Sequence, residues 1–355
     1  MEPHSISAAD ALADLARFDA IIDVRSPGEF ADDHIPGAIN CPVLDDAERA
    51  QVGTLHKQAS AFDARRLGAV LVARNVAAHI ESRFADRPRA WRPLVYCWRG
   101  GQRSGAMATV MARIGWPARL LEGGYRAYRR AVVEQLAHLP ARQRLRVVCG
   151  TTGSGKSLLL QRLAVAGAQV LDLEALACHR GSVLGGLPQQ PQPTQKSFET
   201  RIWAALRAFD PHQPVFVESE SRKVGDLRVP DALIERMRAS ECIRLELPLA
   251  ARVRLLRAEY AHYERDPTAL FTQLDCLTAL HGRERIASWK QFAQRGAWDE
   301  LVECLLLEHY DPAYLRSIDR NFARIGAAQV AAAASDDVSD FDAIARSLMC
   351  EATAP

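Results

Sequence analysis

The sequence predicts an α/β protein of two domains, each built on a parallel sheet. Three observations carry this prediction: a length of 355 residues, alternating strand-like and helical segments in both halves, and two glycine-rich loops that each join a strand to a helix. A hydrophobic content of 48% and a charged content of 25% are those of an ordinary globular chain. We place the domains at residues 1–139 and 140–355, because Pro140 follows the last helical pattern of the first half.

The loop at residues 94–104 joins an apolar, strand-like run to a helix-compatible segment, and Cys97 lies at the junction. Two glycines let the backbone turn back with its N–H groups pointing inward, and two arginines and a helix N-terminus add positive charge. We therefore predict that the pKa of the Cys97 thiol lies well below its ordinary value of about 8.5, and that the loop can hold a tetrahedral oxyanion. The residues assigned to this site are Cys97, Arg99 and Arg103 as catalytic groups and Gly100 and Gly101 as phosphate-binding positions.

Three other segments of the first half have simpler interpretations. Residues 19–24 form an apolar strand, and Asp23 and Arg25 at its end are typical of an ion pair that braces a turn. Between residues 59 and 84 apolar residues recur at helical spacing, which predicts a helix. Residues 52–58 are polar and contain a glycine, so we interpret them as a link before that helix.

The second loop follows a basic lead and an apolar strand at residues 142–149. Residues 150–157 read Gly-x-x-x-x-Gly-Lys-Ser, and a plain helical segment follows them. Successive N–H groups in such a loop cradle a phosphate, the lysine reaches the outer phosphates, and the serine hydroxyl can bind magnesium. The pattern predicts a polyphosphate site and does not specify adenine. The residues assigned to it are Gly150, Gly153, Ser154, Gly155, Lys156 and Ser157.

Strand-like and helical segments alternate after the second loop, which predicts a second parallel sheet. Glu218 follows one of these strands and is our candidate to complete a magnesium site with Ser157; Glu220 and Asp172 are the alternatives. Residues 181–195 are rich in Gly, Pro and Gln and are expected to form a loop. The expected strands are residues 169–173, 214–217 and 242–247, the expected helices are 198–208 and 231–240, and residues 249–350 are mostly helical.

Composition limits the partners and the cellular compartment that we expect for the protein. The formal net charge of +2 excludes a strongly cationic arm, so any contact with nucleic acid has to be local. The eight cysteines include no C-x-x-C pair, which argues against a zinc site or a disulfide framework. The sequence has neither an apolar run of about eighteen residues nor a signal-peptide pattern. We therefore expect a cytoplasmic protein without membrane or DNA partners.

Three motifs of the first half resemble a known family. The segments DVRSPGEF…HIPGAIN, VYCWRGGQRSGAMA and LLEGGYRAYRR are similar, in order, to the entry signature, active loop and closing signature of a rhodanese domain. The resemblance covers residues from about 6 to 138. It implies a five-stranded parallel sheet with helices on both faces and the active loop at the carboxyl end of a central strand. One departure is ADDHIPGA, where rhodanese domains commonly have glycine before the histidine.

The pairing of a rhodanese-like domain with a P-loop domain is itself informative. Together with LDLEALACHRGS, QKSFE and VFVESESRKVG, it resembles the tRNA 2-selenouridine synthases nearly from end to end. The resemblance implies that selenium from selenophosphate replaces the sulfur of a wobble 2-thiouridine, through S-geranylation from geranyl diphosphate. The implied partners are the tRNA anticodon stem-loop and a source of selenophosphate, and Mg²⁺ is the expected cofactor. The run VESES departs from the aspartate expected in its middle and leaves the metal ligand open.

Several alternatives stay open at this level. The complete phosphate loop is also compatible with an ATP-dependent kinase or ATPase regulated by the rhodanese-like domain, and the cysteine loop with a simple sulfurtransferase. Cys97 either accepts selenium as a perselenide or steadies a selenophosphorylated base. Trp98 either stacks on the modified uridine or packs beneath the loop.

Overall fold

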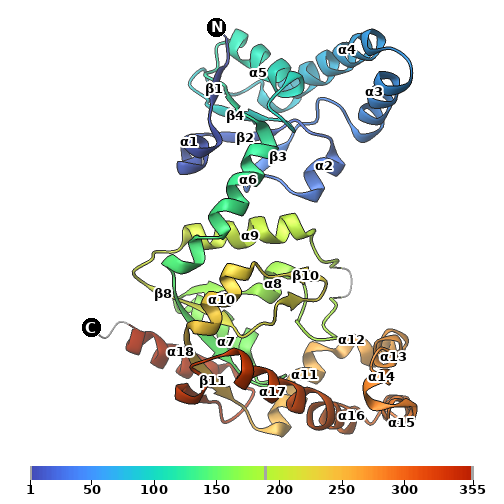
Figure 1. Cartoon of the computed structure of the whole chain (residues 1–355), viewed down its shortest axis with the longest axis vertical. Helices are drawn as coiled ribbons and strands as arrows, with labels where there is room; N and C mark the ends of the chain where they lie inside the picture. Colours follow the sequence, from blue (N-terminus) through green and yellow to red (C-terminus); the bar gives the residue numbers. More distant parts are fainter. Residues whose placement is uncertain (1, 188–189, 353–355) are drawn as a thin grey trace. The chain divides into compact units, whose positions relative to one another are not determined.

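The computed structural model in Figure 1 describes residues 2–187 and 190–352. By its internal contacts the chain divides into two units. The first contains the chain up to Gln135 together with Thr194–Arg201; the second contains Leu136–Pro193 and the chain from Ile202 onward. The expected single boundary at residues 139 and 140 stays a prediction, and the assignment of Thr194–Arg201 to the first unit was not anticipated.

The first unit is built on a five-stranded sheet with the order β1-β5-β4-β2-β3. Every neighbouring pair is parallel, and the central strand β4 pairs with β2 through Ile22 and Val95. This is the sheet that the rhodanese resemblance implies. The strands are β1 (His4–Ile6), β2 (Ala20–Asp23), β3 (Ala38–Asn40), β4 (Pro93–Tyr96) and β5 (Arg119–Leu121).

Helices connect these strands, and buried apolar side chains from both elements form one core that includes Cys97. The helix expected over residues 59–84 is present as α4 with the π-helical turn η2. The polar link expected over residues 52–58 is wrong, because α3 continues to Gln58 from an N-terminus at which Asp45 and Glu48 form a capping box. The elements are α1 (Ala8–Ala13), η1 (Leu15–Arg17), α2 (Pro27–Asp32), α3 (Asp46–Gln58), α4 (Ala61–His79), η2 (Ile80–Phe84), α5 (Gln102–Ile114) and α6 (Gly124–Leu136).

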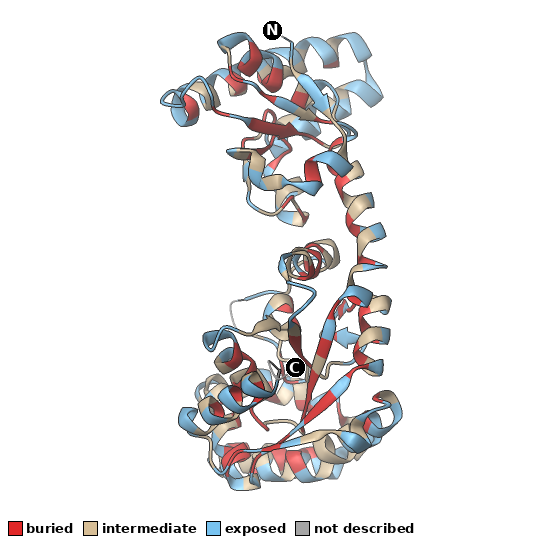
Figure 2. Ribbon diagram, turned by 90° about the vertical axis from the view of Figure 1, so that its left-hand side faces the viewer, coloured by how far each residue is buried: buried red, intermediate tan, exposed pale blue. Residues whose placement is uncertain are grey.

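The second unit has another five-stranded parallel sheet, in the order β12-β11-β6-β8-β7. Buried residues run through the sheets of both units in Figure 2. Strand β12 was not anticipated: its alanine-rich sequence favours helix, and pairing with β11 overrides that local preference. The strands are β6 (Arg144–Cys149), β7 (Gln169–Leu171), β8 (Pro214–Glu218), β11 (Glu241–Glu246) and β12 (Gln329–Ala332), with a separate antiparallel pair β9 (Lys223–Val224) and β10 (Leu227–Arg228).

Helices α7 and α18 pack together over this sheet, where Leu159, Leu163 and Phe341 join the core. The predominantly helical segment after residue 249 is confirmed. The elements are η3 (Leu139–Arg142), α7 (Lys156–Val165), α8 (Leu173–Ala177), α9 (Gln195–Ala208), α10 (Asp231–Ala239), α11 (Leu249–Glu259), α12 (Ala261–Arg265), α13 (Pro267–Asp275), α14 (Thr278–His281), α15 (Arg283–Gln294), α16 (Trp298–Leu305), η4 (Leu306–Tyr310), α17 (Asp311–Asn321), η5 (Ile325–Ala327) and α18 (Val338–Ala352).

Two sequence expectations concern segments between these elements or the chain as a whole. The loop expected over residues 181–195 lies between α8 and α9 except for Gln195, which begins α9, and its positions 188 and 189 are outside the described residues. Among the helices of residues 2–187 and 190–352, none combines the length and apolar character needed to cross a membrane.

Candidate functional site

Cys97 lies directly after the central strand of the first sheet and before helix α5. It is buried, with 4% of its surface exposed. Gly100 has φ +67°, and a Cβ at this position would lie 2.6 Å from the carbonyl oxygen of Leu121. The loop can therefore close tightly only with glycine at this position. Gly101 precedes the first helical residue and is exposed.

The Cys97 thiol is surrounded by hydrogen-bond donors. The Ser104 hydroxyl donates to the sulfur over 3.1 Å. Burial alone raises the pKa of the thiol, but the Ser104 hydroxyl and the N–H groups of Ser104, Arg99 and Gly101 outweigh burial and lower it below its ordinary value. The predicted direction of the shift is thus confirmed. Sequence reasoning missed Ser104 as a contributor; its place in the first turn of the helix that follows the cysteine was the available signal.

The two arginines of this loop differ in their surroundings. Arg103 forms an ion pair with Glu29, with Nη1 2.7 Å from Oε2. Arg99 is exposed, and within the described part of the chain no ion pair to it forms. Since Glu29 already offsets the charge of Arg103, Arg99 is the arginine with charge to offer an incoming anion.

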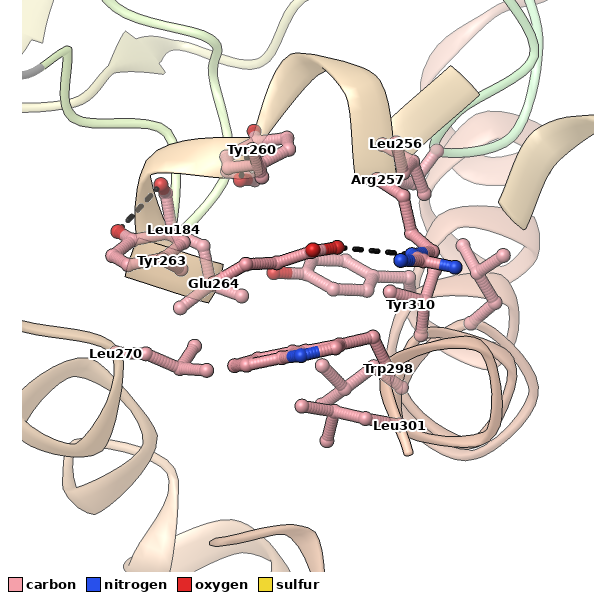
Figure 3. Close-up of a pocket in the computed structure, with 15 residues that line it drawn as sticks. Leu184, Leu256, Arg257, Tyr260, Tyr263, Glu264, Leu270, Trp298, Leu301 and Tyr310 are labelled. Atoms are coloured by element: carbon pink, nitrogen blue, oxygen red, sulfur yellow. Dashed lines mark hydrogen bonds and ion pairs between the residues drawn. The ribbon is translucent and has the colours of Figure 1, made fainter. Parts of the chain in front are cut away.

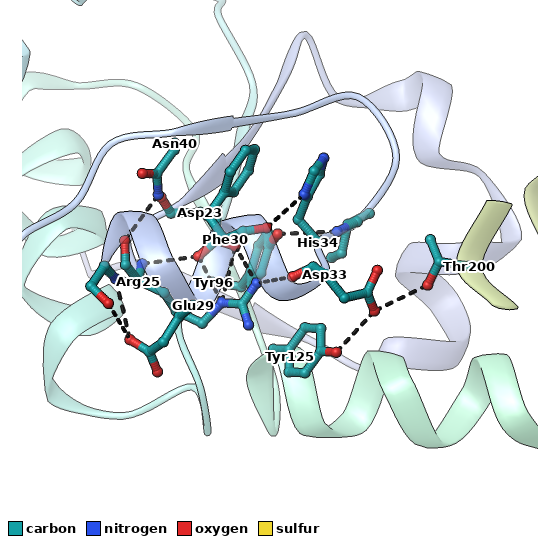
Figure 4. A network of polar contacts seen from close by, with 12 residues as sticks. Asp23, Arg25, Glu29, Phe30, Asp33, His34, Asn40, Tyr96, Tyr125 and Thr200 are labelled. Atoms are coloured by element: carbon teal, nitrogen blue, oxygen red, sulfur yellow. Dashed lines mark hydrogen bonds and ion pairs between the residues drawn. The ribbon is translucent and has the colours of Figure 1, made fainter. Parts of the chain in front are cut away.

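A polar network lies next to this loop, and Figure 4 shows its residues. The predicted Asp23–Arg25 ion pair is confirmed: both side chains are fully buried and their closest atoms are 2.6 Å apart. Arg25 also lies over the ring of Tyr125, 4.0 Å from its centroid, and the Tyr125 hydroxyl donates to Asp33 over 2.9 Å. Asp33 accepts a further hydrogen bond from Thr200. This arrangement fixes the Tyr125 ring under the loop.

The start of helix α6 closes the loop from the other side. The Tyr125 N–H donates to the carbonyl of Cys97 over 2.8 Å, and Gly124 packs so closely that a Cβ there would lie 2.3 Å from the same oxygen. Trp98 stacks on Tyr125, with ring centroids 5.3 Å apart and 29° between the planes, and it is half-buried. The packing interpretation of Trp98 therefore has a structural basis, and its stacking on a uridine stays a prediction.

The loop after β6 has the geometry expected of a phosphate cradle. Gly153 and Gly155 have φ of +76° and +85°, and added Cβ atoms would lie 2.7 Å from Leu256 and 2.5 Å from Phe341. A Cβ at Gly150 would lie 2.4 Å from the hydroxyl oxygen of Ser154. Lys156 begins helix α7, and its ammonium group donates to the carbonyl of Gly150 over 2.9 Å. The loop therefore holds its lysine at the helix N-terminus, beside the N–H groups that bind an anion.

Carboxylates gather on one side of this loop, in a cleft of about 810 Å³. The Ser157 hydroxyl donates to Oε2 of Glu174 over 2.9 Å, and the N–H of Glu174 donates to Oε1 of Glu218 over 2.8 Å. Glu174 is thus the acid in contact with Ser157, and sequence reasoning had not considered it. Glu218 lies behind Glu174, nearly fully buried, and its Oε2 has no hydrogen-bond partner in the described part of the chain.

These carboxyl groups raise one another's pKa values. Burial and the charges of Asp172, Glu174 and Glu220 raise the pKa of Glu218 well above its ordinary value, and burial and Glu174 raise that of Glu220 to about 8. Within the described residues, no three acidic, histidine or cysteine side chains converge as a ready metal site. The oxygen donors fit magnesium nevertheless, because that ion keeps several waters and needs only one or two protein ligands beside phosphate oxygens.

Comparison with known proteins gives two family matches along the chain. Residues 7–131 match the rhodanese-like domain and residues 143–279 match the tRNA 2-selenouridine synthase AAA domain. The predicted fold class, a rhodanese-like domain followed by a P-loop α/β domain with C-terminal helices, is confirmed.

Among curated relatives, the tRNA 2-selenouridine synthase of Nitrosomonas europaea is 38% identical over 247 residues, which cover 68% of this chain and 63% of the relative. The tRNA 2-selenouridine synthase of Bdellovibrio bacteriovorus is 33% identical over 352 residues, which cover 86% of this chain and 90% of the relative. That of Chromohalobacter salexigens is 36% identical, with 85% and 88% covered.

Proposed function

Because the chain belongs to the tRNA 2-selenouridine synthase family, we propose that it is a tRNA-modifying transferase that replaces the sulfur of a wobble 2-thiouridine by selenium. Its proposed substrates are selenophosphate and geranyl diphosphate, its partner is the tRNA anticodon stem-loop, and its setting is the cytoplasm. The observation that carries the proposal is the pairing, in one chain, of a depressed-pKa thiol in a nest of N–H groups with a lysine-bearing phosphate loop.

The first step is alkylation of the thiouridine sulfur. Geranyl diphosphate binds with its pyrophosphate on residues 150–157, and Lys156 turns from the carbonyl of Gly150 to the outer phosphate oxygens. The sulfur attacks the allylic carbon, a C–S bond forms, the C–O bond breaks, and pyrophosphate leaves with the electron pair. Alkylation converts the thione, a poor leaving group, into a thiolate leaving group for the next step.

The second step exchanges the alkylated sulfur for selenium at the Cys97 loop. Selenophosphate binds through its oxygens to the loop N–H groups and to Arg99. The selenium attacks C2 of the base, a C–Se bond forms, and the C–S bond breaks to release geranylthiolate. The Cys97 thiolate then attacks the phosphorus, an S–P bond forms, and the P–Se bond breaks with its electron pair on the selenium. Water hydrolyses the S–P bond, which releases phosphate and restores the thiolate.

Electron balance favours this route over a Cys97 perselenide. Selenium in selenophosphate is already at the selenide level and phosphorus is fully oxidised. Transfer of a neutral selenium atom to the Cys97 thiolate would therefore reduce the phosphorus to phosphite unless an external oxidant took part. The Cys97 loop accordingly acts on the selenophosphorylated base, with the thiolate as the nucleophile at phosphorus and the loop N–H groups as donors to the phosphoryl oxygens.

The acidic cluster beside the phosphate loop is where this chain would hold magnesium. Ser157 and Glu174 would bind the ion, and the unpartnered Oε2 of Glu218 belongs to the same cluster. A bound ion would supply positive charge that offsets the charge developing on the departing pyrophosphate.

Mass spectrometry of tRNA nucleosides tests the proposal. Thiolated tRNA is incubated with the protein, magnesium, geranyl diphosphate and selenophosphate, and each small substrate is also omitted in turn. We expect 2-selenouridine with both substrates and S-geranylated 2-thiouridine when selenophosphate is omitted. Unchanged 2-thiouridine in every reaction, together with substrate-stimulated ATP hydrolysis, would contradict the proposal in favour of the ATPase alternative.

A further inference from the structure

An apolar chamber adjoins the phosphate cleft of the second unit. It has a cavity volume of about 70 Å³. A single water needs roughly 10–15 Å³ of such volume and two or more polar partners, so the chamber has room for several waters but little to bind them. Figure 3 shows its lining, in which Leu270 and Leu301 lie near the rings of Tyr263 and Trp298.

The polar groups around this chamber are mostly occupied by one another. Arg257 forms ion pairs with Glu264 at 2.9 Å and with Asp299 at 3.0 Å. The Tyr263 hydroxyl donates to the carbonyl of Leu184 over 3.1 Å. These contacts leave an apolar interior that is made of leucines and aromatic faces. An apolar ligand would gain there by leaving water.

The chamber opens towards the phosphate loop. Five residues line both the chamber and the acidic cleft that contains Lys156 and Ser157: Thr152, Ser182, Leu256, Tyr260 and Tyr310. Thr152 is itself part of the phosphate loop. At this junction the buried hydroxyl of Tyr310 has no hydrogen-bond partner among the residues that the structure describes. Charge therefore lies on one side of the junction and apolar surface on the other.

The chamber also lies where two hydrophobic clusters meet. One hydrophobic cluster, which includes Leu270, Leu301 and Leu305, belongs to the C-terminal helices; another, which includes Leu256 and Leu306, joins α11 to η4. Tyr260 and Tyr310 pack against both clusters. The helices after residue 249 thus build an apolar compartment beside the loop at residues 150–157.

We propose that this chamber binds the isoprenoid chain of an allylic diphosphate whose pyrophosphate lies on the Lys156 loop. The inference deepens the proposed function and rests on its geranyl diphosphate step. It assigns substrate selection by chain length to Leu270, Leu301 and Trp298. Tyr310 stands at the junction, because it lines both the chamber and the cleft.

Equilibrium binding in magnesium buffer tests the chamber with three probes: inorganic pyrophosphate, dimethylallyl diphosphate and geranyl diphosphate. Each fully buried methylene strengthens binding by about fourfold. We expect geranyl diphosphate to bind at least about tenfold more tightly than dimethylallyl diphosphate, and pyrophosphate to bind most weakly. Equal affinities for the three probes would overturn the chamber proposal and leave the phosphate site standing. A chain that does not bind pyrophosphate at all would overturn the proposed function as well.

Leu301→Phe fills the chamber and separates the chain from the phosphates. Leu301 is 2% exposed, whereas Leu307, six residues further on, is 51% exposed, so Leu307→Phe is the matched control. We expect Leu301→Phe to lose at least about tenfold in geranyl diphosphate affinity with pyrophosphate binding unchanged, and Leu307→Phe to change neither. Leu270→Phe, on another part of the lining, repeats the test if Leu301→Phe does not fold. Retained preference for the geranyl chain in both filled variants would contradict the proposal.

Discussion

The two loops of this protein share a backbone plan and differ in charge. Each follows the central strand of a five-stranded parallel sheet, β4 in the first unit and β6 in the second. Each also contains glycine at positive φ and leads into a helix. In the Cys97 loop, the Ser104 hydroxyl and three N–H groups are directed at the sulfur that the loop itself carries. In the loop at residues 150–157, the Lys156 ammonium donates to the carbonyl of Gly150 and lies beside a cluster of carboxyl groups.

The two loops therefore differ in the charge that they stabilise. In the first loop this charge belongs to the loop itself, whereas the second loop is suited to charged ligands from solution. The Cys97 loop already stabilises an anion, the thiolate. The phosphate loop is flanked by acids whose pKa values are raised, so a bound cation would relieve their mutual repulsion. Similar strand–loop–helix geometry therefore supports two chemistries, which are set by the side chains rather than by the fold.

Single substitutions should separate the two loops functionally, with the largest effects on activity. Cys97→Ser should lower selenation about a thousandfold and leave geranylation intact, because only the second step uses the thiolate.

Lys156→Ala should lower geranylation about 10²–10³-fold and leave tRNA binding and the selenation of pre-geranylated tRNA intact. Nucleoside mass spectrometry measures both steps.

Two surface substitutions control for this separation. Cys276→Ser removes an exposed cysteine, and Lys290→Ala removes a lysine paired with Asp275 on the surface. Both should leave each step unchanged. If Cys97→Ser abolished geranylation, or Lys156→Ala blocked selenation of pre-geranylated tRNA, the assignment of one step to each loop would be wrong.

Ser104→Ala tests how much the Ser104 hydroxyl contributes to the lowered pKa of the Cys97 thiol. The Ser104 hydroxyl bond favours the thiolate, and a hydrogen bond to a charged group contributes about 1.5–3 kcal/mol. Its loss should raise the pKa of Cys97 by about 1–2 units. The pH dependence of iodoacetamide alkylation, followed at the Cys97 peptide by mass spectrometry, measures the shift.

The matched control is Ser82→Ala, since the Ser82 hydroxyl bonds only to a backbone carbonyl on an exposed helix. It should leave the alkylation profile of Cys97 in place. An unchanged profile in Ser104→Ala as well would mean that the backbone N–H groups alone set the pKa of the thiol.

Local motifs predicted the strands, helix starts and glycines of both loops, because spacing and residue type determine them. Ser104 and Glu174 were missed for a different reason. Each lies several residues from the group it contacts, Cys97 and Ser157, and only the folded chain brings the pair together. Strand β12 shows the same limit, since its pairing partner β11 lies more than eighty residues away. The apolar chamber combines residues from 152 to 310, and no single segment of the sequence indicates it.

The smallest expected effect is on the stability of the protein, and it concerns the acidic residues beside the phosphate loop. The pKa of Glu220 is raised to about 8 in the folded protein by burial and by Glu174, above its ordinary unfolded value of 4.5. A raised carboxyl pKa contributes stability that is fully present below the unfolded value and is lost as pH rises through the folded value. Glu220→Gln should therefore raise the thermal unfolding midpoint by a few degrees near pH 8 and by little at pH 5, in magnesium-free buffer. Glu300→Gln, at an exposed position, should change neither midpoint. If Glu220→Gln raised the thermal unfolding midpoint equally at both pH values, the gain would not come from relief of carboxylate repulsion. Such repulsion would then not be a property that distinguishes the phosphate loop from the Cys97 loop.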